Sequence, residues 1–166
     1  RHCFERNVAR DRSPTQYLLE IYKERGEADK YVAELEWVVA IDHDDFDKRM
    51  ELATIYRQDG KRDKMIAMLE EALFIEPRDL KLHAYLAEGY QETGKLDLAL
   101  REYRILIVQC KKVNKEGKHD RRIADWFCEM AEIKMQQGDR DEAAKFVHEA
   151  QRLVPSFPRA QELRAK

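Results

Sequence analysis

The residues best suited to catalysis or metal binding lie along this sequence without the spacing that either chemistry needs. The histidines, at positions 2, 43, 83, 119 and 148, include no pair four residues apart, the spacing that places two imidazoles on one helix face. No Cys-x-x-Cys motif occurs, and glycines stand singly rather than in a phosphate-binding loop. The sequence therefore predicts no catalytic residue, no metal site and no cofactor.

Cys128 is the thiol that invites comparison with a nucleophile. A reactive thiol needs a neighbouring base and positive surroundings, whereas Glu129 and Glu132 supply negative charge. The odd number of irregularly spaced cysteines is typical of reduced thiols and mildly favours a cytoplasmic location. We therefore expect a protein that is not an enzyme.

The composition narrows the classes of partner. The chain has 166 residues, of which 39% are charged, with a net charge of −2 and no apolar run long enough to span a membrane. One basic stretch, at 111–122, lacks the interleaved aromatic residues of a nucleic-acid site, so a solvated helical hairpin is the favoured interpretation. Nucleic acid is thus an unlikely partner.

The elements that must position any site are helices. Residues 46–79 predict two short amphipathic helices, because Leu52 and Tyr56 precede a break at Gly60, and Met65 and Leu69 follow it. Aspartates are expected to cap helices at Asp44 or Asp45, Asp79 and Asp120, and Pro14 to begin the first helix after Ser13. This helix-turn-helix unit recurs along the chain.

The recurrence has a fixed period. Gly26, Gly60, Gly94 and Gly138 are separated by 34, 34 and 44 residues, the last interval being 34 plus ten. Around them the order of large, small, aromatic, glycine, small, large and small residues repeats in register over 12–155 and resembles the tetratricopeptide repeat (TPR). The departures are local. The family's first-helix tryptophan is replaced by Thr15, Arg49, His83 and Phe127, and Lys134 replaces an aromatic residue in the last unit.

The resemblance implies an all-α, right-handed α-solenoid of TPR helix-turn-helix repeats with a C-terminal capping helix. We expect four repeats at about 12–45, 46–79, 80–123 with the ten-residue insertion, and 124–155, followed by a capping helix at 156–166. Residues 1–12 read as a frayed end or a linker from upstream sequence. Trp37 and Trp126 are interpreted as packing residues.

The resemblance also implies a concave groove, lined by the first helices of the repeats, that binds a peptide or a helix. Mapped onto this sequence, the groove positions carry nine acidic and three basic residues, a net charge of −6, which predicts a basic or amphipathic partner. The partner-binding residues expected are Tyr17, Glu20, Glu24, Asp47, Met50, Glu51, Arg57, Lys81, Tyr85, Glu88, Glu92, Asp125, Cys128, Glu129, Glu132 and Met135.

Other interpretations remain open. The acidic residues could be solvated helix surface, partly paired with lysines one turn away. The chain could be a structural or self-associating solenoid whose groove is filled internally, and thus a homo-oligomer. It could also be an accessory domain of a larger enzyme.

Overall fold

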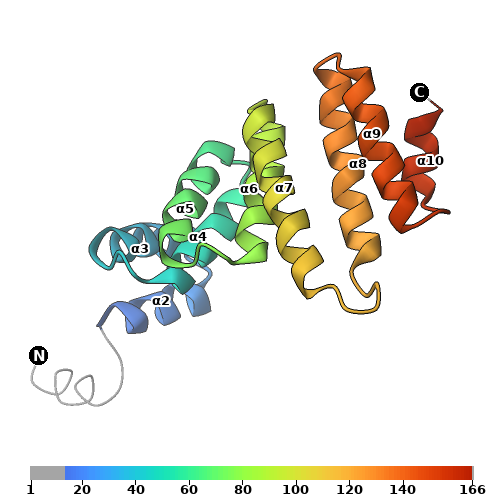
Figure 1. Ribbon diagram of the computed structural model, residues 1–166. Helices are drawn as coiled ribbons and strands as arrows, with labels where there is room; N and C mark the ends of the chain where they lie inside the picture. The colour runs from blue at the N-terminus through green and yellow to red at the C-terminus, as the bar shows by residue number, and fades with distance from the viewer. Residues whose placement is uncertain (1–13, 166) are drawn as a thin grey trace, which may run out of the picture. The chain divides into compact units, whose positions relative to one another are not determined.

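The computed structural model describes residues 14–165, and all regular structure in that range is helical. The helices are α2 (Pro14–Arg25), α3 (Ala28–Ile41), α4 (Phe46–Gln58), α5 (Arg62–Ile75), α6 (Leu80–Glu92), α7 (Leu96–Val113), α8 (Asp120–Gln136), α9 (Arg140–Leu153) and α10 (Pro158–Arg164) (Figure 1). The expectations for residues 1–12, and for Ser13 as a cap, lie outside the described residues.

The chain divides into two compact units at Pro77. In the first unit α2 pairs with α3 and α4 with α5, and α3 packs against α4. Its core contains Leu35, Leu52, Met65 and Leu69, each no more than 2% exposed. The pairing follows from the amphipathic pattern, because one helix pair cannot bury its own apolar stripe.

The second unit contains the pairs α6–α7 and α8–α9, with α7 packed against α8 and α10 packed against both α8 and α9 (Figure 1). Its core includes Leu86, Leu106, Ile123 and Met130. Small residues at the crossings, such as Ala131, are fully buried and let the helices approach closely. α10 thus has its own packing surface on the last helix pair.

The turns confirm the helix ends and helix starts that the sequence predicts. Gly26, Gly60, Gly94 and Gly138 all adopt left-handed φ values of 67° to 81°, which favour glycine after a helix end. Asp45 caps α4 by accepting from the backbone N–H of Lys48, and Asp79 caps α6 by accepting from two backbone N–H groups. α2 begins at Pro14, as expected.

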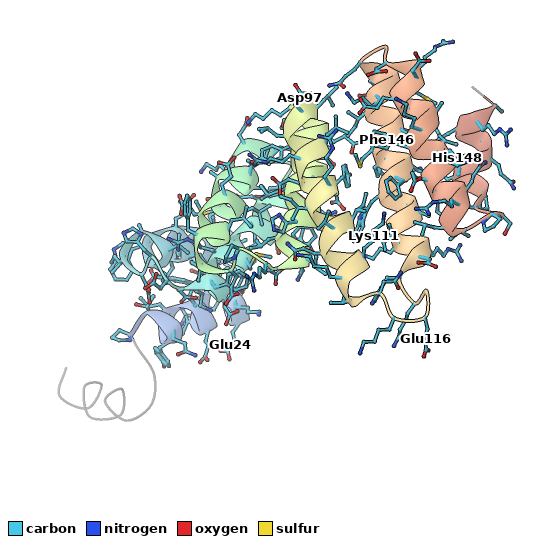
Figure 2. The ribbon with its side chains drawn as sticks, viewed as in Figure 1. Glu24, Asp97, Lys111, Glu116, Phe146 and His148 are labelled. Carbon is cyan, nitrogen blue, oxygen red and sulfur yellow. The ribbon has the colours of Figure 1, made fainter. Side chains whose placement is uncertain are left out.

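The ten extra residues lengthen α7 and α8 and form the turn between them, in which Glu116 lies (Figure 2). The expected cap Asp120 is the first helical residue instead, and the N-cap is His119. The reason is that Oδ1 of Asp120 accepts a hydrogen bond of 2.6 Å from the amide of Asn114. Asn114 also accepts from the backbone of His119, so its side chain holds the turn together.

Of the positions that carry tryptophan in the family, Arg49, His83 and Phe127 are buried and Thr15 is half-buried, so the position is chemically different in each repeat. Arg49 is 2% exposed and donates to the backbone carbonyls of Val39, at 3.0 Å, and Asp42, at 3.3 Å, at the end of α3. A cation is favoured there by the free carbonyls of a helix C-terminus. Trp126 is buried as expected, whereas Trp37 is 55% exposed, so its interpretation as a packing residue was wrong.

Candidate functional site

Three carboxylates of the expected groove share one face of α8. Asp125, Glu129 and Glu132 are four and three residues apart, a spacing that places side chains on one side of a helix. Their side chains are 50%, 22% and 34% exposed to solvent, respectively. We call them the α8 carboxylates.

The α8 carboxylates hold an arginine of the same chain. Nη1 of Arg159, on α10, lies 2.9 Å from Asp125 and 2.7 Å from Glu129. Its Nη2 and Nε donate to the two oxygens of Glu132 at 2.9 and 3.1 Å, a bidentate pair. Burial opposes the charged guanidinium, but its hydrogen bonds to Glu129, Glu132 and Asp125 outweigh this effect and raise the pKa of Arg159.

The sequence of α10 explains how it presents this arginine. Pro158 starts the helix, and Phe157, Ala160 and Leu163 are at most 7% exposed and pack into the second unit. Arg159 lies between the first two of these apolar residues and reaches the face of α8. A short helix with an apolar stripe therefore places one of its two arginines, Arg159, in this part of the expected groove.

A hydrogen-bonded chain ties the α8 carboxylates to the rest of the second unit. The amide of Gln91, on α6, donates to Glu129 at 3.2 Å, and the hydroxyl of Tyr103, on α7, donates to Gln91 at 2.9 Å. Burial, followed by the charges of Glu129 and Glu88, raises the pKa of Tyr103. Glu129 thus accepts from two helices at once.

Two expected groove residues of α8 do not belong to an open acidic surface. Cys128 has no exposed surface, and burial raises the pKa of its thiol to about 11. Its inclusion among partner-binding residues therefore has no support in its position. Met135 lines a cavity between α8, α9 and α10 together with Val147 and Leu163.

In the first unit, Glu51 of α4 is an expected groove residue that contacts other side chains of the chain. It accepts a hydrogen bond from the hydroxyl of Tyr31, on α3, and pairs with Lys48 at 3.4 Å. Burial and the bond to Glu51 raise the pKa of Tyr31. Like Glu129, this carboxylate lies close to a cation of the chain.

The other expected residues lie on exposed or half-buried surfaces of their helices. On α2, Tyr17 and Glu24 are exposed and Glu20 is half-buried, and Figure 2 shows Glu24 projecting from that helix. On α4, Asp47 and Arg57 are exposed and Met50 is half-buried. On α6, Lys81 and Glu92 are exposed, Tyr85 and Glu88 are half-buried, and the ammonium of Lys81 lies 5.6 Å from the ring centre of Tyr85.

Residues in the basic hairpin use aromatic partners that sequence spacing did not reveal. Lys111, near the end of α7, lies 5.1 Å from the ring centre of Phe127, and Arg122 lies 4.9 Å from that of Trp126. Both are within cation–π range. The rings therefore have intramolecular cation partners.

A buried polar pair in the second unit was missed by sequence reasoning. Nδ1 of His83 lies 2.6 Å from Glu102, and the two residues are 4% and 1% exposed. Arg101 adds two contacts to the same carboxylate, at 3.0 and 2.9 Å. In the 34-residue register His83 replaces a packing tryptophan, and that substitution was the available signal.

Residues 14–165 contain no group of three or more histidine, cysteine, aspartate or glutamate side chains arranged to hold a metal ion. Over the same range, no helix has both the length and the apolar character needed to cross a membrane.

The fold is that of known TPR proteins. A crystal structure of MamA protein superposes with a TM-score of 0.66 at 14% identity, covering 90% of this chain and 76% of MamA. A tetratricopeptide repeat protein from Parabacteroides merdae gives 0.67 at 16% identity, covering 91% and 57% of the two chains. The N-terminal domain of stress-induced protein-1 from C. elegans gives 0.63 at 12% identity, covering 74% and 94%. No protein-family model matches the sequence, and neither does any curated protein.

These similarities define the class of protein. The chain has the all-α TPR fold, an α-solenoid of helix-turn-helix repeats, as its sequence predicted.

Proposed function

We propose that this chain is a non-catalytic protein-interaction scaffold that binds a basic or amphipathic helix or peptide on the acidic faces of its first helices. Helical repeat proteins present extended surfaces of this kind to partners. The observation that carries the proposal is the set of ion pairs between the α8 carboxylates and Arg159. In these contacts a first-helix face binds a basic side chain from a short amphipathic helix.

The same observation suggests where a partner would bind. On α8 the carboxylates contact the chain's own arginine, so a partner would either replace Arg159 there or use the acidic residues of the other first helices. These are Glu20 and Glu24 on α2, Asp47 and Glu51 on α4, and Glu88 and Glu92 on α6. Tyr17, Met50 and Tyr85 offer apolar contact beside them.

A peptide-display selection against the whole chain tests the proposal. We expect basic, amphipathic peptides to be enriched, and the enrichment to be lost when Glu51→Lys and Glu88→Lys are combined, because each substitution turns attraction into repulsion. The matched control combines Glu34→Lys, on α3, with Asp141→Lys, on α9, which changes the net charge equally on second helices. Peptides that survive both pairs of substitutions would exclude the acidic faces of α4 and α6 as the binding site.

The internal occupancy of the α8 face also favours a second candidate, a structural solenoid that satisfies its own acidic surface. Under that alternative no peptide is selected even after Arg159→Ala exposes the α8 carboxylates. If the surface instead pairs with another copy, light scattering gives a mass above that of the 19.8 kDa monomer.

A further inference from the structure

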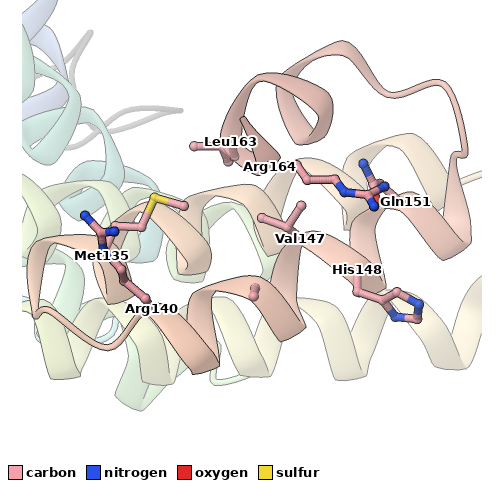
Figure 3. Close-up of a pocket in the computed structure, with 8 residues that line it drawn as sticks. Met135, Arg140, Val147, His148, Gln151, Leu163 and Arg164 are labelled. Carbon is pink, nitrogen blue, oxygen red and sulfur yellow. The ribbon is translucent and has the colours of Figure 1, made fainter. Parts of the chain in front are cut away.

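The second unit has a groove of opposite character on its C-terminal side. A cavity of about 570 Å³ is lined by Met135 of α8, by Arg140, Ala144, Val147, His148 and Gln151 of α9, and by Leu163 and Arg164 of α10 (Figure 3). A second hollow of about 390 Å³ shares Gln151 and Arg164 with it. Because the two hollows share these lining residues, we treat them as one site, which we call the C-terminal groove.

The groove has an apolar floor and a cationic rim. Val147 and Leu163 are buried at 4% and 3% exposure and form the floor with Ala144. Arg140 and Arg164 carry positive charge at the rim, and none of the lining residues of either hollow is acidic. In Figure 3, Arg140 lies near Met135 at one end of the cavity and Arg164 near Gln151 at the other.

The repeat register shows what kind of surface this is. Forty-four residues earlier, Ala144 corresponds to Leu100 and Gln151 to Ile107, on α7. Leu100 and Ile107 are 3% and 5% exposed, and the helix that carries them, α7, packs against both α6 and α8. The corresponding stripe of α9 therefore has the geometry of a helix-packing surface.

The cover over this stripe differs between the two places. After α7 comes α8, with 17 residues, whereas after α9 comes α10, with seven. α10 packs against α8 and α9, and the cavity of about 570 Å³ lies between these three helices. Within the described residues, α10 therefore leaves part of the α9 stripe uncovered.

We propose that the C-terminal groove binds an acidic amphipathic helix of a partner protein. The apolar side chains of such a helix would pack on Val147, Ala144 and Leu163, and carboxylates flanking them would pair with Arg140 and Arg164. The charge of the rim selects against the basic partner proposed for the first helices, so one chain would take two partners of opposite charge. This inference stands apart from the proposed function, since it uses different residues.

The direct test measures binding of two labelled, alanine-based helical peptides by fluorescence anisotropy. Both carry leucines three and four residues apart on one face; one has glutamates beside the leucines and the other has lysines. We expect the glutamate peptide to bind the whole chain, and to shift the NMR signals of His148 and Val147, while the lysine peptide leaves those signals in place. Equal perturbation of His148 and Val147 by both peptides would overturn the proposal.

Variants separate charge from shape. Arg140→Glu combined with Arg164→Glu should weaken the glutamate peptide about tenfold, since two attractive contacts become repulsive. Lys118→Glu combined with Arg121→Glu, at exposed sites near the α7–α8 turn, makes the same charge change elsewhere and should have little effect. Ala144→Trp, at an exposed site, should block the cavity without changing charge.

The outcomes are distinct. Loss of binding in both groove variants, with folding confirmed by circular dichroism and binding retained in the control, supports the proposal. Unchanged affinity in all variants overturns it. If Ala144→Trp lowers the mass of the unliganded chain in light scattering, the groove holds a second copy of this chain, and the partner helix is excluded. None of these results depends on the Glu51→Lys and Glu88→Lys test of the proposed function.

Discussion

Arg159 is expected to contribute more to stability than its partial exposure suggests. Its guanidinium contacts three carboxylates, and its side chain keeps 30% of its exposure. An isolated surface ion pair contributes about 0–1 kcal/mol, whereas breaking a buried pair costs about 3–5 kcal/mol. A partly exposed network of one cation and three anions falls between these limits.

We therefore expect Arg159→Ala to lower the free energy of unfolding of the second unit by about 1–2 kcal/mol. Urea unfolding followed by the fluorescence of Trp126 measures the change. The matched control is Arg152→Ala, because Arg152 pairs with the single carboxylate of Glu149 one turn away and is 60% exposed. If both variants lose the same small amount, the α8 carboxylates do not hold α10.

Tyr103 predicts a response to alkaline pH. Its pKa is raised in the folded state by burial and by neighbouring carboxylates. The contribution of its protonated hydroxyl to the free energy of unfolding is therefore fully present below the ordinary pKa of about 10. As pH rises further, the unfolded chain loses its phenolic proton first and the free energy of unfolding falls. Tyr103→Phe removes this contribution, and its stability should therefore decline less steeply above pH about 10.

The measurement is urea unfolding of the parent and of Tyr103→Phe at a series of pH values from neutral to alkaline. At neutral pH the variant should be less stable by about 1 kcal/mol, because the hydrogen bond to Gln91 is lost. A parent and variant that decline in parallel above pH about 10 would show that Tyr103 ionises equally well in both states.

At the scale of helices, one structural position is filled in different ways along the chain. The pair His83–Glu102 joins α6 to α7, and 44 residues later Phe127 and Phe146 join α8 to α9 with ring centres 6.2 Å apart. In the repeat before, Arg49 occupies the first position and Met68 the second. The position between a first and a second helix thus accepts polar or apolar pairs.

This equivalence predicts a non-additive mutant pair. Glu102→Met alone should cost about 1–3 kcal/mol, because it removes the carboxylate that buried His83 contacts, whereas Arg101 is 60% exposed and can be solvated. The combination of His83→Phe with Glu102→Met, residue types used at the equivalent positions, should be nearly neutral or stabilising. Urea unfolding of His83→Phe, of Glu102→Met and of the double variant closes the cycle. A double variant that loses the sum of both single costs would contradict this view of the pair.

At the scale of the molecule, the repeat organisation predicts how far the chain can be divided. The second unit, 78–166, has its own core and its own helix pairs. We expect this fragment alone to show helical circular dichroism and cooperative urea unfolding, since each repeat relies on its nearest neighbours. Gradual unfolding without a transition would show that the unit needs the rest of the chain.

The helices and their turns could be predicted because their signals are local. Each turn glycine, the caps Asp45 and Asp79, and the start at Pro14 depend on a few adjacent residues and on the 34-residue register. Asp120 failed as a cap because Asn114, six residues earlier, binds its side chain across the turn. That contact depends on the turn conformation.

The acidic character of the first-helix faces could be predicted, but the occupant of the α8 face could not. Arg159 lies 27 to 34 residues from the carboxylates it contacts, in a segment whose sequence indicated a polar cap. The sum of charges over the expected groove positions does not include Arg159, because residues 156–166 were expected to form only a capping helix. The packing of Phe157 and Leu163 decides where the arginine points, and that requires the three-dimensional arrangement.

The burial of Cys128 also makes the rate of its alkylation a measure of local opening in the second unit. Its thiol has no exposed surface and a pKa raised to about 11, and it lies next in sequence to Glu129, which Arg159 holds. Alkylation at neutral pH therefore has to wait for a rare event that uncovers and ionises the sulfur. Mass spectrometry can follow the alkylated fraction of Cys128 over time, with buried Cys110 as the internal reference. This rate would report how often the structure around Cys128 opens locally.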